Sequence, residues 1–153
     1  MILVAIDPGN RTGYVKLDVC VETQVVKVVD MGTVQIHDIV QFKNSVLPEY
    51  LDEANIVCYE TWIQLTNAAT GSIVNEIIGA VKLFANPNAV VKGQIPSTRL
   101  ICIKPLNLKT YSHDPDDISA FKHAMSYLLI NKFLDPDKVS FEHSNRSERA
   151  FAK

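Results

Sequence analysis

The acidic residues that could do chemistry in this sequence stand where apolar runs end or where a helix begins. They are Asp7, Glu60, Asp114, Asp116 and Asp117. A carboxylate at the end of a buried strand is costly unless a cation compensates its charge. If the strands that end on Asp7 and Glu60 lie side by side, the two carboxylates repel each other, and a divalent metal ion removes that repulsion. Because Mg²⁺ binds a few carboxylates together with water and phosphate oxygens, the pattern predicts a magnesium site at one edge of a sheet.

Each of these acids also has an ordinary structural explanation. Asp7 precedes Pro8 and Gly9 and fits a turn. Asp114, before Pro115, fits a helix N-cap, and an acid in the first turn also interacts favourably with the helix dipole. Acids occur together at the ends of two apolar strands and at the start of the last helix, in the element order described below. This joint occurrence favours the metal site over the separate structural explanations.

The angular positions of the acids on the helix that begins near residue 115 indicate which of them face the site. At about 100° per residue, Asp114 and Asp117 lie on the edge of the buried stripe, whereas Asp116 is expected to face solvent. The predicted ligands from this region are therefore Asp114 and Asp117. His113 is the other candidate there, as a cap or as a base that activates water.

The elements that must position these acids follow from apolar runs and turn residues. The expected strands are 2–6, 13–21, 23–35, 56–59 and 100–103, and the expected helices are 37–51, 68–85 and 117–133. Pro48 favours a break in the first of these helices. Three strands in succession favour an antiparallel meander, and the later strands follow helical crossovers and are parallel.

The fold class is therefore α/β. We expect a five-stranded mixed sheet, three antiparallel strands and then parallel ones, with helices on both faces, which is the order of the RNase H-like fold. A single domain is expected over residues 1–153, with a polar tail from about residue 135 that is mobile or docks on a partner.

The composition is that of an ordinary globular protein with an uneven distribution of charge. The chain has 153 residues, 47% hydrophobic and 21% charged, and its formal net charge of −2 points to no partner. Residues 1–81 carry four basic and ten acidic residues, a net −6, whereas 82–153 carry eleven basic and seven acidic, a net +4. The stretch 82–112 contains five cations and no acid. The cations are therefore gathered in one half of the chain.

The spacing of the cysteines and the hydropathy of the chain indicate the cellular compartment in which the protein is expected. Cys20, Cys58 and Cys102 are widely spaced in apolar runs, without a CxxC motif or a Cys/His cluster. This pattern predicts reduced thiols rather than zinc or disulfides. No stretch reaches the roughly 18 apolar residues of a membrane span, and the first residues lack the basic leader of a signal peptide. We therefore expect a cytoplasmic protein with no membrane partner.

Together these residues resemble the motifs of the RuvC-type Holliday junction resolvases, in particular the short members found in phages. The run Ile6–Tyr14 is similar to the family's first strand and turn, with Asp7 as the metal-binding aspartate. Tyr-Glu-Thr-Trp at 59–62 resembles the strand end that bears the family's glutamate, here Glu60. His-Asp-Pro-Asp-Asp at 113–117 resembles the family's final acidic motif.

The final acidic motif can be aligned in more than one register. The pairs His113/Asp116 and Asp114/Asp117 both have the family's three-residue spacing. A third register places Ser119 where the family has an acid, and it would make the chain catalytically weak.

The resemblance, which covers residues 1–133, implies a homodimeric, Mg²⁺-dependent endonuclease that nicks symmetrically across a four-way DNA junction. Two Mg²⁺ ions in each active site, which Mn²⁺ could replace, would activate the attacking water and stabilise the leaving 3′-oxygen. Asp7 would bridge the two ions, with Glu60 and Asp114 or Asp117 holding one each. The implied location is the cytoplasm of a bacterium or of a phage-infected host.

Contacts with branched DNA are expected from the acid-free stretch and from the tail, through phosphate interactions that weaken with salt. The candidate basic residues are Lys82, Lys92, Arg99, Lys104, Lys109, Arg146, Arg149 and Lys153. Lys109 is the first choice, and Lys104 the second, for the basic residue that stabilises charge at the scissile phosphate. Trp62 would stack on an unpaired base or cap the core. The long helix 68–85 would carry the dimer face, although burial within the monomer explains much of its apolar pattern as well.

Other functions fit parts of the same pattern. A ribonuclease H that acts on an RNA–DNA hybrid shares the acids and the fold. A catalytically weak, structure-specific DNA-binding protein would bind branched DNA without cleaving it. The run from Asp7 to Gly13 also resembles the phosphate loop of the actin, hexokinase and heat-shock ATPases. Those enzymes need a second such domain, for which 153 residues are too few, so no nucleotide cofactor is expected.

Overall fold

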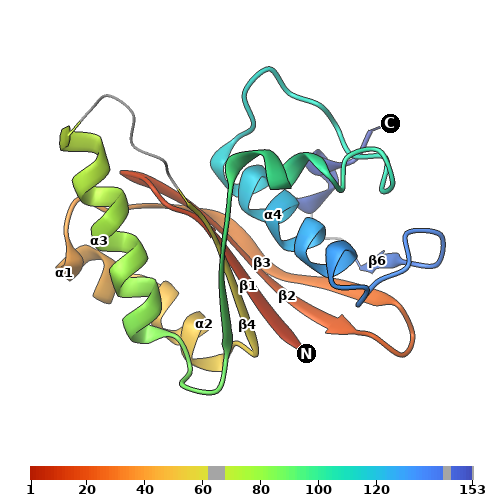
Figure 1. Ribbon diagram of the computed structural model, residues 1–153, viewed down its shortest axis with the longest axis horizontal. Coiled ribbons are helices and arrows are strands. Elements are labelled where there is room, and N and C mark those ends of the chain that lie inside the picture. Colours follow the sequence, from red (N-terminus) through yellow and green to blue (C-terminus); the bar gives the residue numbers. More distant parts are fainter. Residues whose placement is uncertain (62–67, 143–145, 153) are drawn as a thin grey trace.

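A mixed six-stranded sheet organises the residues that the computed structural model describes, which are 1–61, 68–142 and 146–152 (Figure 1). The strands are β1 (Ile2–Asp7), β2 (Arg11–Cys20), β3 (Val25–Gln35), β4 (Ile56–Glu60), β5 (Val90–Gln94) and β6 (Ser140–Glu142). Their order across the sheet is β5-β4-β1-β2-β3-β6. Strands β1 to β3 form an antiparallel meander, and β4, β5 and β6 each pair in parallel. The predicted mixed sheet is confirmed, with six strands in place of five.

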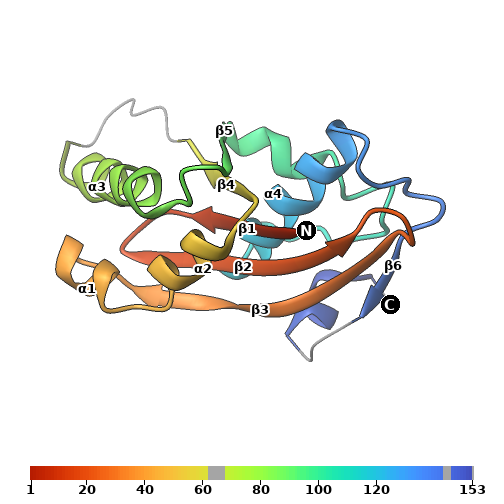
Figure 2. The ribbon, with the colours of Figure 1, turned by 90° about the horizontal axis from the view of Figure 1, so that it is seen from below.

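Helices cover both faces of this sheet, as the two views in Figures 1 and 2 show. The helical segments are α1 (Ile39–Lys43), α2 (Leu47–Glu53), α3 (Ala68–Phe84), α4 (Asp116–Ile130) and the 3₁₀ helices η1 (Pro96–Leu100) and η2 (Ser147–Ala150). Helices α1, α2 and α3 pack on one face, and α4 packs on the other. Among the described residues, no helix is both long and apolar enough to cross a membrane.

Strand β1 separates two hydrophobic cores. Leu3 and Ala5 are fully buried in the core that α4 covers, whereas Val4 and Ile6 are fully buried in the core that α1, α2 and α3 cover. Successive side chains of a strand point to opposite faces, so a strand covered on both faces is apolar throughout. This is why the run before Asp7 contains no polar residue.

The predicted strand 100–103 is wrong, and the fifth strand is formed by Val90–Gln94. Cys102 is fully buried, but Leu100 and Ile101 are about half exposed. The apolar run is therefore divided between core and surface within η1 and the turns that follow. Strand β5 lies at the edge of the sheet with its first three residues exposed, so it lacks the apolar signal of a buried strand.

The predicted helix 37–51 is two short helices, α1 and α2, separated by residues 44–46. Pro48 stands in the first positions of α2, where its fixed φ and missing N–H are compatible with a helix start. The break that this proline favours therefore precedes it. Helix α4 starts at Asp116 and ends at Ile130, where 117–133 was predicted.

The tail beyond residue 135 packs on the domain's own core, which corrects the expectation of a mobile or partner-docked segment for its described residues. Strand β6 pairs with β3. The rings of Phe141 and Phe151 lie 6.4 and 6.0 Å from the ring of Phe121 on α4, and Phe151 forms a β-bridge with Leu108. Two phenylalanines within a polar segment thus attach the tail to the core.

Candidate active site

The parallel pairing of β1 with β4 brings Asp7 and Glu60 to the same edge of the sheet. Ile6 pairs with Tyr59, so both strands end at the same level and their terminal carboxylates are neighbours. The adjacency of these two strands, on which the prediction of a metal site depended, is therefore present.

The start of α4 is held against β2 at this edge by a close approach of two main chains. Gly13 pairs with Asp7 across the β1–β2 ladder. A Cβ atom built at Gly13 would lie 2.1 Å from the carbonyl oxygen of Asp116 and 2.7 Å from the amide nitrogen of Asp117, so the helix could not sit there against any larger residue. A backbone contact therefore sets the helix acids beside the strand acids.

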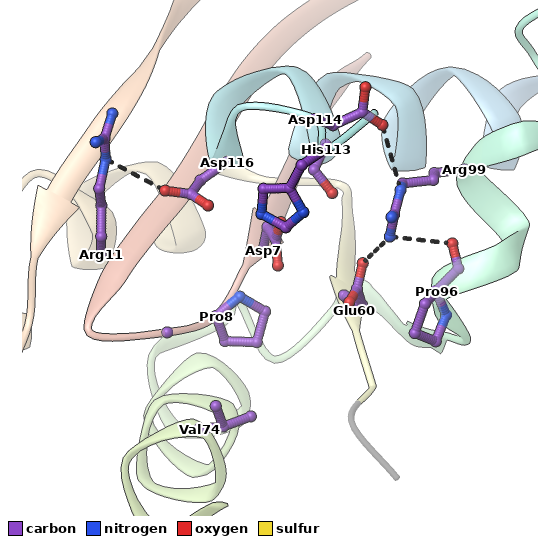
Figure 3. Close-up of a pocket in the computed structure, with 12 residues that line it drawn as sticks. Asp7, Pro8, Arg11, Glu60, Val74, Pro96, Arg99, His113, Asp114 and Asp116 are labelled. Atoms are coloured by element: carbon purple, nitrogen blue, oxygen red, sulfur yellow. Dashed lines mark hydrogen bonds and ion pairs between the residues drawn. The ribbon is translucent and has the colours of Figure 1, made fainter. Parts of the chain in front are cut away.

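A cavity of about 560 Å³ opens where these elements meet (Figure 3). Its polar and charged lining consists of Asp7, Glu60, Asp114, Asp116, His113, Ser119, Arg11 and Arg99. Four of the five acids singled out in the sequence line the cavity, and Asp117 does not.

The carboxylate of Asp7 is partly buried and lies beside the carboxylate of Glu60. Burial and, next in weight, the neighbouring Glu60 carboxylate raise the pKa of Asp7 from 3.8 to about 6. The ion pairs formed at this edge by the described residues involve the other acids and not Asp7. A bound cation would relieve this excess of negative charge.

Glu60 is held from two sides. Its Oε2 atom accepts a hydrogen bond from Nη1 of Arg99 at 3.0 Å and lies 2.8 Å from Nε2 of His123. The other ring nitrogen of His123, Nδ1, lies 2.7 Å from Oε1 of Gln94 at the end of β5. Since His123 is fully buried on α4, this chain of contacts ties β4 and β5 to the helix.

Asp114 is also held from two sides. Its Oδ1 atom accepts a hydrogen bond from Nζ of Lys122, and its Oδ2 atom lies 3.3 Å from Nε of Arg99. Lys122 is fully buried and donates a second hydrogen bond, of 2.8 Å, to the carbonyl oxygen of Lys109. The buried ammonium group thus fastens the segment before α4 to the helix.

The expected orientation of the two acids at the start of α4 is wrong. Asp116 lines the cavity and forms an ion pair with Arg11, with 3.2 Å between Oδ2 and Nε. Asp117 points elsewhere: its Oδ1 accepts from the amide of Ile118, and its Oδ2 accepts from Arg149. The expectation assumed one buried stripe, but α4 is buried without a break from Asp117 to Leu128. The phase of the apolar residues therefore did not identify the side that faces the acids.

The carboxylates of this cavity have the chemistry that a hard divalent cation requires. Asp7, Glu60, Asp114 and Asp116 offer oxygen ligands of the kind that Mg²⁺ prefers, and burial together with the Glu60 carboxylate raises the pKa of Asp7. In the described part of the chain, however, no three His, Cys, Asp or Glu side chains are gathered at metal-binding distance. The donor set fits the ion, and the side-chain cations that now hold three of the four acids would have to share them or move.

The basic residues predicted to contact DNA or phosphate do not gather in the cavity, with the exception of Arg99. Lys109 and Lys104 do not line it, so the structure does not place them beside the acids. Lys92 is exposed on β5, and the ammonium of Lys82 on α3 lies 5.7 Å from the centre of the Tyr59 ring.

The tail cations make intramolecular contacts. Arg146 donates to the carbonyl oxygen of Met31 on β3, and Arg149 bonds to Asp117. Trp62 and Lys153, also predicted to contact DNA, lie outside the described residues.

Sequence reasoning assigned no role to several polar residues that line or support the site. Lys122 and His123 interrupt an otherwise apolar helix stripe, and two adjacent polar residues there are the signal that could have identified them. Arg11 lay within the matched N-terminal motif but received no role. Gln94 had no signal, because the strand that it ends was not predicted.

Several solved structures are similar to this chain. The RuvC structure of Thermus thermophilus superposes with a TM-score of 0.66 at 16% identity, covering 86% of this chain and 96% of that one. RuvC of the same organism in complex with a Holliday junction substrate superposes with a TM-score of 0.61 at 15% identity, covering 86% of this chain and 96% of that one. The fowlpox virus Holliday junction resolvase superposes with a TM-score of 0.56 at 17% identity, covering 86% of this chain and 99% of that one. No protein-family model matches the chain, and no curated protein sequence does.

These likenesses concern the three-dimensional arrangement, since the identities are 15–17%. They agree with the element order, with the mixed sheet and with helices on both of its faces. The chain therefore has the RNase H-like fold of the RuvC-type resolvases, as the predicted order of its elements indicated.

Proposed function

We propose that this protein is a divalent-metal-dependent endonuclease that resolves branched DNA, with the four-way junction as its substrate. The observation that carries the proposal is the meeting of Asp7, Glu60, Asp114 and Asp116 in one cavity at the edge of the sheet. The solved structures with this fold include RuvC of Thermus thermophilus and the fowlpox virus Holliday junction resolvase, each of them also in complex with Holliday junction DNA. Fold alone leaves the chemistry open, so the proposal depends on the cavity.

The proposed ligand set differs by one residue from the set favoured by the sequence. Asp7, Glu60, Asp114 and Asp116 would hold Mg²⁺, or Mn²⁺ in its place, and Asp117 would not, because it bonds to Arg149 away from the cavity. Bound in this cavity, two such ions would supply an activated water and stabilise the leaving oxygen of an in-line phosphodiester displacement. His113 and Asp116 both line the cavity. They are the pair that one of the two alignments of the final acidic motif places at the three-residue spacing.

The remaining polar residues of the cavity have roles of their own. His113 lines the cavity and would accept a proton from water there. Arg11 and Arg99 line the same cavity and would bind the oxygens of the scissile phosphate. His123 and Lys122 remain behind the acids, fully buried, and fix the carboxylates of Glu60 and Asp114.

A homodimer is part of the proposal, because paired nicks across a junction need two active sites. Helix α3 supplies a suitable surface: Leu83 is 76% exposed, and a Cβ atom built at Gly79 would meet nothing within 4 Å. An exposed leucine beside a glycine allows a second helix to approach closely. Light scattering should therefore give twice the mass of the chain.

The direct test is cleavage of a synthetic four-way junction in Mg²⁺. Wild-type protein should produce symmetric nicks, and Asp7→Asn should abolish them while junction binding, measured in Ca²⁺, is retained, since the carboxylate serves the metal rather than DNA. Cleavage by Asp7→Asn at the wild-type rate would refute the assignment of the site.

The choice of substrate separates the proposed function from its rivals. An RNA–DNA hybrid and a linear duplex are the control substrates. Preferential cutting of the hybrid would identify a ribonuclease H. Tight binding of the junction without cleavage in either Mg²⁺ or Mn²⁺ would identify a structure-specific DNA-binding protein.

A further inference from the structure

Arg99 occupies the space between two of the acids that the proposed function assigns to metal. Its Nη1 atom lies 3.0 Å from Oε2 of Glu60, and its Nε atom lies 3.3 Å from Oδ2 of Asp114 (Figure 3). Nη1 also donates to the carbonyl oxygen of Pro96 at 3.3 Å. One guanidinium group thus bridges two carboxylates that come from different elements, as a cation between them would.

The contacts of Arg99 are weaker than those of an arginine with a fixed structural role. Each carboxylate is met by a single nitrogen rather than by the two parallel hydrogen bonds of a bidentate pair. The buried Nε atom makes no hydrogen bond within the described residues, because its approach to Asp114 satisfies the distance of an ion pair but not the geometry of a hydrogen bond. A buried donor without a partner is an energetic cost.

The two carboxylates do not depend on Arg99 alone. Glu60 is also in contact with His123, and Asp114 is also bonded to Lys122. The side chains of His123 and Lys122 are fully buried on α4, whereas that of Arg99 is 25% exposed at the wall of the cavity. Of these three groups, Arg99 is therefore the one that can leave the acids without disrupting the core.

The movement would be that of the side chain. The backbone of Arg99 is fastened to the core, because its carbonyl oxygen lies 3.4 Å from Sγ of the buried Cys102. The head of the side chain lies beside the cavity, which has room for it. A rotation about the side-chain bonds would carry the positive charge from the acids into the cavity.

We infer that Arg99 is a displaceable internal cation, which competes with the divalent metal for Glu60 and Asp114 and turns toward the substrate phosphate when the metal binds. This inference rests on the proposed function, since it concerns the same site. In the metal-free protein Arg99 limits the repulsion between the acids. In the metal-bound protein the guanidinium group of Arg99 is released from the acids and can bind a phosphate oxygen. The same positive charge therefore contacts the acids in one state and the substrate in the other.

The test measures metal and DNA separately, without relying on cleavage. Calorimetric titration with Mn²⁺ should show that Arg99→Gln binds the metal about 5- to 30-fold more tightly than wild type, which corresponds to one or two kcal/mol of lost competition. The same variant should bind a four-way junction more weakly in Ca²⁺, because a phosphate contact is lost. Opposite changes in the two affinities are not expected of a residue that merely supports the fold.

Arg11→Gln is the matched control, since it removes the same charge from the same cavity. Arg11 contacts the single acid Asp116 and is 61% exposed, so its loss should tighten Mn²⁺ binding by less than about 3-fold. Equal tightening by both variants would show a general effect of charge and overturn the inference. Unchanged or weaker Mn²⁺ binding by Arg99→Gln would overturn it as well.

A measurement on the wild-type protein keeps the inference testable if Arg99→Gln does not fold. The Nε–H resonance of Arg99, assigned through its absence from the spectrum of Arg99→Lys, should shift and exchange faster with water when Mg²⁺ is added. A resonance that stays in place while calorimetry records Mg²⁺ binding would refute the displacement. Absence of metal binding to wild type and to both variants would instead remove the proposed metal site itself, and the inference with it.

Discussion

Replacing Asp116 or its neighbour Asp117 by asparagine is the sharpest comparison that the cavity offers, because the same small change is made at adjacent positions. Asp116 lines the cavity, and its partner Arg11 is 61% exposed. The side chain of Asp117 is 8% exposed and bonds to Arg149 away from the cavity. If Asp116 is the metal ligand, Asp116→Asn should lose cleavage and Asp117→Asn should keep it.

The magnitudes follow from these environments. Metal-ion catalysis contributes several kcal/mol of transition-state stabilisation, so loss of a ligand should slow cleavage by about 10²- to 10³-fold. The exposed pair of Asp116 with Arg11 contributes little to folding, and the free energy of unfolding should change by less than about 1 kcal/mol. Asp117→Asn loses the charge of a buried group, but Arg149 is 48% exposed. We therefore expect it to lower the free energy of unfolding by about 1 kcal/mol and the Tm by about 2–4 °C.

The assay is single-turnover cleavage of a four-way junction in Mg²⁺, at a temperature at which both variants are folded, together with thermal melting of each. Asp116→Asn should be nearly inactive with a Tm close to wild type, and Asp117→Asn should be active with a lower Tm. Wild-type cleavage by Asp116→Asn, with loss of cleavage by folded Asp117→Asn, would refute the reasoning and restore the register that the sequence favoured.

Three further variants test the environment of the site and the attachment of the tail. The pKa of Asp7 is about 6 in the folded protein against 3.8 for the ordinary side chain, so the folded state binds more protons between these pH values and loses stability as pH rises through them. Metal-free Asp7→Asn should accordingly be about 3 kcal/mol more stable than wild type at pH 7 and little different at pH 4. Urea denaturation in EDTA at the two pH values measures this, and an equal difference at both would contradict it. Lys122→Met leaves the buried carboxylate of Asp114 without its main partner and should cost about 3 kcal/mol in the same assay at pH 7; a neutral result would show that Arg99 suffices. Phe151→Ala removes a ring that packs on Phe121 and should lower the free energy of unfolding by about 2 kcal/mol, whereas no change would mean that the tail contributes nothing to stability.

The element order and two of the acids could be predicted from the sequence because the central strands are covered on both faces. Such strands are apolar without interruption, so the point at which Asp7 and Glu60 end them is visible in the sequence itself. Strand β5 gave no comparable signal, because it lies at the edge of the sheet and most of its residues are exposed. The apolar run 100–103 is the stronger pattern, and it predicts a strand that does not form.

Which acids Lys122 and His123 contact could not be predicted, for a different reason. Periodicity identifies one buried face of a helix, but α4 is buried on all sides from Asp117 to Leu128 and therefore has no exposed face to set the phase. Lys122 and His123 are buried because they bond to Asp114 and Glu60, which are contacts between residues far apart in the sequence. Such pairs become visible only when the sheet edge and the helix are placed together.

The contact of Gly13 with the main chain of Asp116 has a consequence for the order of folding. Gly13 belongs to the antiparallel meander, which forms from neighbouring segments, whereas α4 follows most of the chain. Closing a contact between segments so far apart is slow, because the loop entropy is lost before the contact stabilises anything. We therefore expect the four acids to come together only when α4, the last long helix, docks on the meander. A chain that has folded its meander but not seated α4 would be compact and lack the cavity, so recovery of metal binding during refolding reports the docking of this helix.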